Sequence, residues 1–232
     1  MRLRIGFMIQ PIATNVWLLS YPLPKLGADL RRNVTVIRLS SADLVIHSTG
    51  PFAAEDIVAI SALGSPRWLV DAMLSHDTFA REGREAFPKA SYLAPPGFAV
   101  DEEFPVGELL PPPPEWGAEL QVLEVEGVPS YGEYVFFHAD SRTLIVADLV
   151  FNFGPDEPVW TELMLKLAVT GDHHPGMSRP FKLAIEDEGA FRRSMDAMFA
   201  WDFDRVIVGH GDVIETGGKE KVTAMLRGAG LQ

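Results

Sequence analysis

Residues 141–154 read S-R-T-L-I-V-A-D-L-V-F-N-F-G. The apolar run at residues 144–147 stops at Asp148 and resumes at Leu149. A short run of β-branched and aliphatic residues predicts a strand that is buried on both faces. A carboxylate inside such a run costs several kcal/mol unless it is paired, hydrogen-bonded or bound to a metal. Asp148 is therefore either a helix cap or turn residue at the end of a strand, or a ligand.

A second stretch, residues 205–212, reads R-V-I-V-G-H-G-D. It predicts another buried strand, which ends on His210 between two glycines. Imidazole and carboxylate groups are common metal ligands, and two strands each end on one of them. We therefore expect a shared rim where Asp148 and His210 meet.

The composition limits the class of protein. A length of 232 residues predicts a single domain over residues 1–232. The net charge of −12 argues against nucleic acid or an anionic membrane as the main partner. A small-molecule substrate of unknown identity is expected. The sequence contains no cysteine, so disulfides and thiolate metal sites are excluded, and a reducing cytoplasmic location is expected. No apolar run is long enough to span a bilayer.

Strands and helices are expected to alternate along the chain, which predicts an α/β layered fold. Strands are predicted at residues 15–20, 34–39, 44–48, 68–74, 89–93, 120–126, 134–137 and 205–208, and a strand with its terminal turn is predicted at residues 141–153. Helices are predicted at residues 55–63, 79–87, 160–169, 185–200 and 219–227. Asp77 or Thr78 is expected to cap the second of these helices. Residues 98–116 include four consecutive prolines and predict an irregular loop.

Several of these pieces, in this order, resemble the metallo-β-lactamase fold superfamily, and most closely an uncharacterised branch built on a domain of unknown function. The pieces are L-V-I-H-S-T-G at 44–50, H-D-T-F at 76–79, A-F-P at 86–88, the stretch 141–154, and W-D-F-D-R-V-I-V-G-H-G at 201–211. The resemblance implies an αββα sandwich, with two β-sheets packed together and helices outside.

The resemblance also implies a metal site that has lost part of its ligand set. Asp148 matches the superfamily's bridging Asp, and His210 matches its final His. His76 matches the closing His of the H-x-H-x-D-H motif, with Asp77 close enough to replace the Asp of that motif. The three histidines of the other metal site have no counterpart here. The implied site therefore holds one zinc or iron ion on His76, Asp148 and His210, with Asp77 as a fourth candidate ligand and with Asp148 and His210 as the catalytic pair.

The other candidate residues carry a weaker signal. The adjacent pair His173 and His174, with Arg179 after them, could reach the rim and bind a substrate. Exposed loop histidines are also often inert, and Arg179 is equally plausible in an ordinary salt bridge. His138 is expected to be solvated in a hairpin turn. His47 stands where the superfamily usually has an Asp-containing turn, and a structural role is expected for it.

Three functions remain open from the sequence. The first is a mononuclear metal-dependent hydrolase of an ester, lactone or phosphoester. The second is a catalytically silent small-molecule-binding or scaffold protein with a decayed, degenerate metal site. The third is a metal-dependent redox protein, because some members of the superfamily use iron.

Overall fold

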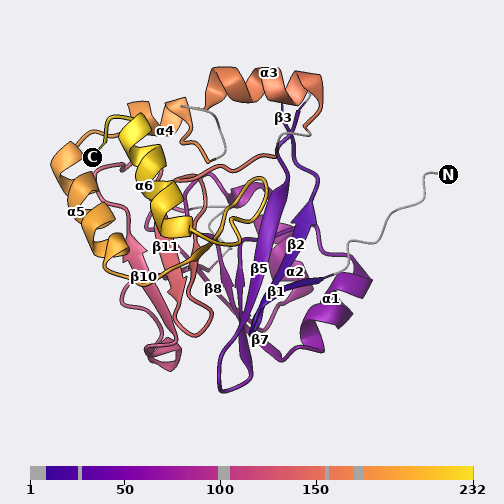
Figure 1. Cartoon of the computed structure of the whole chain (residues 1–232). Coiled ribbons are helices and arrows are strands. Elements are labelled where there is room, and N and C mark those ends of the chain that lie inside the picture. Colours follow the sequence, from indigo (N-terminus) through magenta and orange to yellow (C-terminus); the bar gives the residue numbers. More distant parts are fainter. Residues whose placement is uncertain (1–8, 26–27, 99–104, 155–156, 170–174, 232) are drawn as a thin grey trace.

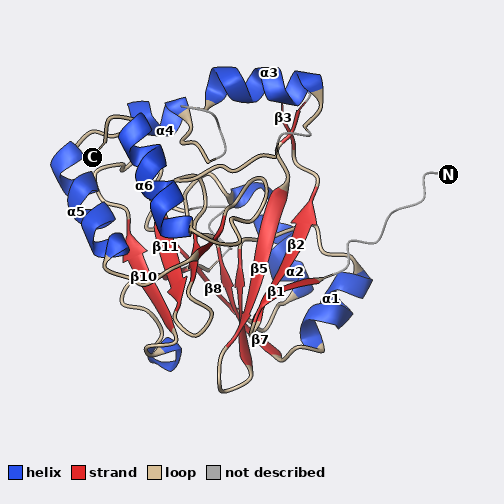
Figure 2. Ribbon diagram, in the orientation of Figure 1, coloured by secondary structure: helices blue, strands red, loops and turns tan. Residues whose placement is uncertain are grey.

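A computed structural model describes residues 9–25, 28–98, 105–154, 157–169 and 175–231. Two β-sheets pack face to face, and helices cover the outer face of each sheet (Figures 1 and 2). The predicted αββα sandwich is confirmed. None of the helices in the described part of the chain has the length and apolar character needed to cross a membrane.

The larger sheet is built from the first half of the chain, in the order β1-β2-β5-β6-β7-β8-β9. Its strands are β1 (Gln10–Ala13), β2 (Val16–Tyr21), β5 (Arg32–Arg38), β6 (Asp43–His47), β7 (Ser65–Val70), β8 (Ser91–Ala94) and β9 (Gly107–Glu108). Helices α1 (Ala54–Ser61) and α2 (Ala80–Ala86) accompany it, with the 3-10 helix η1 (Asp77–Phe79) before α2. A separate two-stranded sheet pairs β3 (Pro24–Lys25) with β4 (Ala28–Asp29).

The smaller sheet is built from the second half, in the order β10-β11-β12-β13. Its strands are β10 (Leu120–Glu124), β11 (Tyr134–His138), β12 (Thr143–Ile145) and β13 (Arg205–Ile207). The remaining helices are η2 (Pro114–Trp116), α3 (Val159–Ala168), α4 (Arg179–Leu183), α5 (Glu188–Phe199) and α6 (Gly218–Gly228). Strands β12 and β13 are parallel, so their carboxyl ends lie at the same edge of the sheet.

Alternating side chains divide the core into layers, as the two-residue period of a strand requires. Ile145 of β12 packs between the two sheets, whereas Leu144 packs beneath α5 and α6. Val34 and Val36 of β5 pack on the outer face of the larger sheet with α1 and α2. Both faces of each sheet are thus covered, which explains why the apolar runs of the sequence are nearly continuous.

Some local predictions were wrong. The strand expected within residues 141–153, together with its terminal turn, is shorter than predicted: β12 ends at Ile145, and the backbone bends at residues 147–149. The helix expected from residue 185 begins at Glu188, because the Asp187 side chain accepts from the Ala190 amide and acts as its N-cap. Neither Asp77 nor Thr78 caps α2, whose N-cap is Phe79, because η1 occupies those residues.

Helix α3 also differs from its expected packing. Its predicted apolar side of Trp160, Leu163 and Leu167 is 51%, 47% and 66% exposed. Thr161 and Leu165 face the protein instead. The irregular loop expected at 98–116 contains β9 and η2 among its described residues. It ends on Trp116, which is fully buried against Trp68 and Phe136, because an indole of this size gains most from a packed environment.

Candidate metal centre

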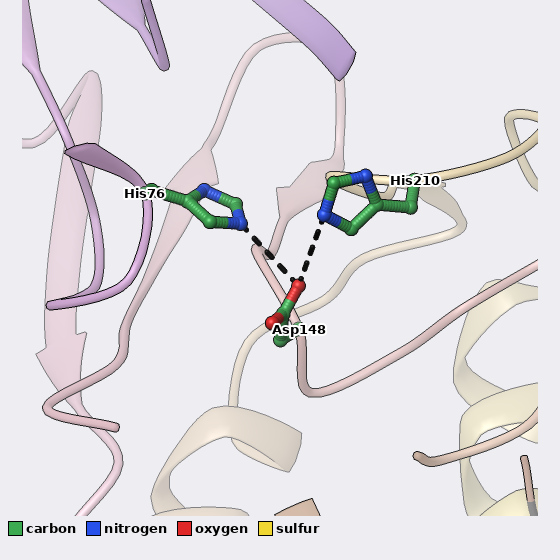
Figure 3. A group of neighbouring side chains, drawn as sticks. All are labelled: His76, Asp148 and His210. Atoms are coloured by element: carbon green, nitrogen blue, oxygen red, sulfur yellow. Dashed lines mark hydrogen bonds and ion pairs between the residues drawn. The ribbon is translucent and has the colours of Figure 1, made fainter. Parts of the chain in front are cut away.

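Three side chains from distant parts of the sequence converge at the carboxyl ends of the strands (Figure 3). The Nε2 atoms of His76 and His210 each lie 3.3 Å from Oδ1 of Asp148. One ligand atom from each residue lies within 4.8 Å of the other two. Both histidine side chains are buried, and the Asp148 side chain is 18% exposed, so the open side of the group is at the carboxylate.

Asp148 lies in the turn that follows β12, and a buried carboxylate holds this turn. Oε1 of Glu133 accepts from the amides of Ala147 and Leu149 at 2.9 and 3.1 Å. Oε2 of Glu133 accepts from the amide of Asp148 at 3.0 Å. Successive N–H groups that converge on one anion form a backbone nest. The turn therefore presents the Asp148 side chain in one defined direction.

His210 follows β13, and its two flanking glycines allow the backbone to pack closely. A Cβ on Gly209 would lie 2.7 Å from the carbonyl oxygen of Ala147. Gly211 has a φ of +101°, and a Cβ there would lie 2.0 Å from the carbonyl oxygen of Asn152. Because of both contacts, the His210 loop packs against Ala147 and Asn152, which flank Asp148 in the chain. The G-H-G sequence is thus required by backbone contact.

Two neighbours fix the His210 ring. Its Nδ1 donates to the backbone carbonyl of Arg31 over 2.5 Å, and the Phe151 ring stacks on it at 5.4 Å between centroids. The Asn33 side chain donates to the carbonyls of Val208 and Gly211, at 2.9 and 2.8 Å, and so holds the loop on both sides of the ring. These contacts direct Nε2 of His210 towards Asp148.

His76 is the N-cap residue of η1 and is buried. Burial and the nearby Arg32 guanidinium lower the pKa of His76 to about 3, so its ring is neutral near pH 7. Burial alone would raise the pKa of Asp148, but its contacts with His210 and His76 hold it well below its usual range. The group thus combines a neutral imidazole with an ionised carboxylate, as a metal site requires.

More buried charges surround the group. Burial raises the pKa of Asp71 to about 6, and this carboxylate accepts hydrogen bonds from Thr49 and from the Tyr92 hydroxyl. Burial and the Asp148 charge raise the pKa of Glu133 to about 8. Arg32 is 1% exposed, and burial lowers the pKa of its guanidinium while the charges of Asp71 and Asp148 act to raise it. The carboxylates of Asp71, Glu133 and Asp148 outnumber this guanidinium, so the region favours either a further cation or protonated acids.

Comparison with known proteins places this geometry in a known fold. No family model matches the sequence, and no curated protein matches it. Among solved structures, the metallo-β-lactamase from Hirschia baltica aligns over 96% of this chain and 97% of its own, at a TM-score of 0.63 and 16% identity. The chain has the metallo-β-lactamase fold. Because no family model matches, the resemblance to an uncharacterised branch stays a prediction.

Two further solved structures that align with this chain are a second metallo-β-lactamase and a flavodiiron core. The metallo-β-lactamase FIM-1 from Pseudomonas aeruginosa in its mono-zinc form aligns over 97% of this chain and 96% of its own (TM-score 0.59, 12% identity). The metal-soaked Flv1 flavodiiron core from Synechocystis sp. PCC6803 aligns over 96% of this chain and 60% of its own (TM-score 0.62, 11% identity). At this level of identity the likeness shows the metallo-β-lactamase fold alone.

The geometry of the three side chains fits a metal ion. A carbonyl oxygen only accepts, so Nδ1 of His210 carries the proton that it donates to Arg31. With Nδ1 bonded to Arg31, Nε2 of His210 faces Oδ1 of Asp148 at 3.3 Å. Neighbouring ligands of a tetrahedral Zn²⁺ with bonds of about 2.0–2.1 Å are about 3.3–3.4 Å apart. Both histidine–aspartate separations agree with that spacing.

The remaining predicted site residues are placed differently. Asp77 is exposed in η1 and is not part of the group of three ligands. Arg179 is exposed at the first position of α4. His173 and His174 lie outside the described residues. The prediction that His138 is solvated was wrong, because it is buried and its Nδ1 contacts the Ser141 hydroxyl at 2.7 Å.

Several residues that position the three candidate ligands were not identified from the sequence. Glu133, Asn33 and Arg32 bear no fixed spacing to the three ligands, so no motif marks them. Asp71 had a usable signal, because it ends the apolar run W-L-V of β7 as Asp148 ends its own run. His47 is buried against the Phe136 ring at 4.9 Å, which is consistent with its expected structural role.

Proposed function

We propose that this chain is a mononuclear metal-dependent hydrolase of an ester, lactone or phosphoester. The observation that carries the proposal is the convergence of two imidazole nitrogens and one carboxylate oxygen within 4.8 Å of one another. Two imidazoles and one carboxylate form a common ligand set for zinc or ferrous iron and leave a coordination position open.

His76, Asp148 and His210 would hold the ion, which supplies Lewis acidity and lowers the pKa of a water molecule towards neutrality. The Arg31 carbonyl keeps the proton of His210 on Nδ1, so Nε2 stays available as a donor atom. Asp148, on the open side of the group, would orient the attacking water through the carboxylate oxygen that does not bind the ion. In the reaction the water oxygen bonds to the acyl carbon or phosphorus, the bond to the leaving oxygen breaks, and that oxygen takes up a proton.

One metal per chain is part of the proposal. Among the residues that the structure describes, one group of three side chains could hold a metal ion, and Asp77 is outside it. The substrate is proposed to be a small molecule. His173, His174 and Arg179 remain candidates for binding it. A cytoplasmic location is also proposed, because the sequence contains no cysteine.

The test is elemental analysis of purified protein, followed by a hydrolysis screen of the metal-loaded chain on ester, lactone and phosphoester substrates. We expect about one zinc or iron per chain and turnover that a chelator abolishes. Absence of metal after reconstitution with zinc or iron would favour the silent binding or scaffold protein. One iron with redox activity and no hydrolysis would favour a redox protein, a class suggested by the fold likeness to the flavodiiron core.

A further inference from the structure

Glu133 is a buried acid with an unusual set of partners. It lies directly before β11 and is 0% exposed. Its two carboxylate oxygens accept from three consecutive backbone amides, those of residues 147, 148 and 149. Burying a carboxylate is costly unless hydrogen bonds compensate for the lost hydration. The Glu133 carboxyl group thus bonds to the backbone of the turn that carries Asp148.

The hydrogen bonds change the direction of the chain. Val146 packs beneath α5 and α6, and Ala147 packs between the two sheets, as the alternation of a strand requires. In a regular continuation residue 148 would therefore face the helix layer. Instead Leu149 and Val150 both pack into that layer, and Asp148 meets His76 and His210. The alternation breaks at the residues whose amides bond to Glu133.

We propose that Glu133 is a positioning residue for the metal site, which holds the turn so that Asp148 can act as a ligand. This inference rests on the proposed function. Glu133 acts through the backbone of the ligand and does not itself lie among the ligand atoms. Groups that orient a metal ligand typically change metal affinity by about 10–100-fold when they are substituted. We expect a loss of that size in the Glu133→Gln variant, because one oxygen acceptor becomes an NH₂ donor that faces a backbone N–H.

Asp56 offers a matched control. It is a buried carboxylate that accepts from the Tyr21 hydroxyl at 2.9 Å and from the Ala53 amide at 3.0 Å. These bonds hold the start of α1, and Asp56 is not part of the ligand group. Asp56→Asn should therefore lower the stability of the protein and leave its zinc affinity unchanged.

The experiment measures zinc affinity by chelator competition in wild type, Glu133→Gln and Asp56→Asn, with unfolding of the metal-free proteins in parallel. A 10–100-fold loss of affinity in Glu133→Gln alone supports the inference. Wild-type affinity in a destabilised Glu133→Gln would overturn it. If Glu133→Gln does not fold, Glu133→Asp, which keeps the carboxyl group but shortens the side chain, is measured in the same way.

Amide exchange separates this inference from the proposed function. In metal-free wild type, the amides of residues 147–149 should exchange slowly, because Glu133 holds all three. Exchange as fast as in exposed loops would overturn the role of Glu133 even if the protein binds zinc. Slow exchange in a chain that binds no zinc would support the inference that Glu133 fixes the turn. It would also refute the metal-dependent function.

Discussion

Asp148→Asn should remove most of the stabilisation that zinc gives to the protein. Asp148 supplies the anionic atom of the group of three, since His76 is neutral near pH 7. Zinc at a hundred times its Kd stabilises wild type by about 2.7 kcal/mol. For a chain of this length, 1 kcal/mol corresponds to about 2–4 °C in Tm, so zinc should raise the Tm of wild type by about 5–11 °C.

The same zinc concentration should act only weakly on the variant. If the loss of the carboxylate weakens binding about 100-fold, zinc is present at about its Kd and stabilises by about 0.4 kcal/mol. The expected rise in Tm is then about 1–2 °C. The assay is thermal unfolding followed by circular dichroism, with and without zinc, after removal of metal by a chelator.

Asp77→Asn is the matched control, because it removes a neighbouring carboxylate that is exposed and outside the group. Its zinc-dependent rise in Tm should equal that of wild type. A reduced rise would mean that Asp77 moves to the metal and completes the ligand set. An equal rise in Asp148→Asn and wild type would refute the assignment of Asp148 as a ligand.

Two further predictions concern Gly211, which follows His210, and the buried His47. Gly211→Ala should lower both stability and zinc affinity, because its Cβ would meet the Asn152 carbonyl at 2.0 Å. Gly228→Ala in α6, with nothing within 4 Å, should do neither, as unfolding and zinc titration of both variants will show. Burial lowers the pKa of His47 to about 3, so below pH 6.5 the unfolded chain binds the extra proton and stability falls as pH falls. Between pH 6.5 and 4.5 this fall is about 2.3 kcal/mol for one such histidine, and urea unfolding of His47→Gln should show a decline that is smaller by about that amount. An unchanged decline would mean that His47 can be protonated in the folded protein.

Local patterns in the sequence were enough to predict most of the layered fold. Apolar runs such as residues 144–147 and 205–208 identify buried strands, because a strand covered on both faces has no polar side. The same runs pointed to Asp148 and His210, since a polar group at the end of such a run must find a partner. The position of His76 came from the resemblance to a known superfamily, because one histidine after an apolar run has no distinctive spacing of its own.

Only the tertiary structure decided how these residues are held. Glu133 precedes Asp148 by fifteen residues and bonds to backbone amides, and the identity of a backbone donor is independent of sequence. Strand β12 ends at Ile145 for that reason, since the amides of residues 147, 148 and 149 bond to Glu133. The exposed side of α3 is a second case, because periodicity predicts an apolar stripe but not what the stripe contacts. The sequence by itself determined which segments are buried and which polar groups end them. The proton on His210 Nδ1, the direction of Asp148 and the convergence of three ligands depend on contacts between segments far apart in the chain, which exist only after folding.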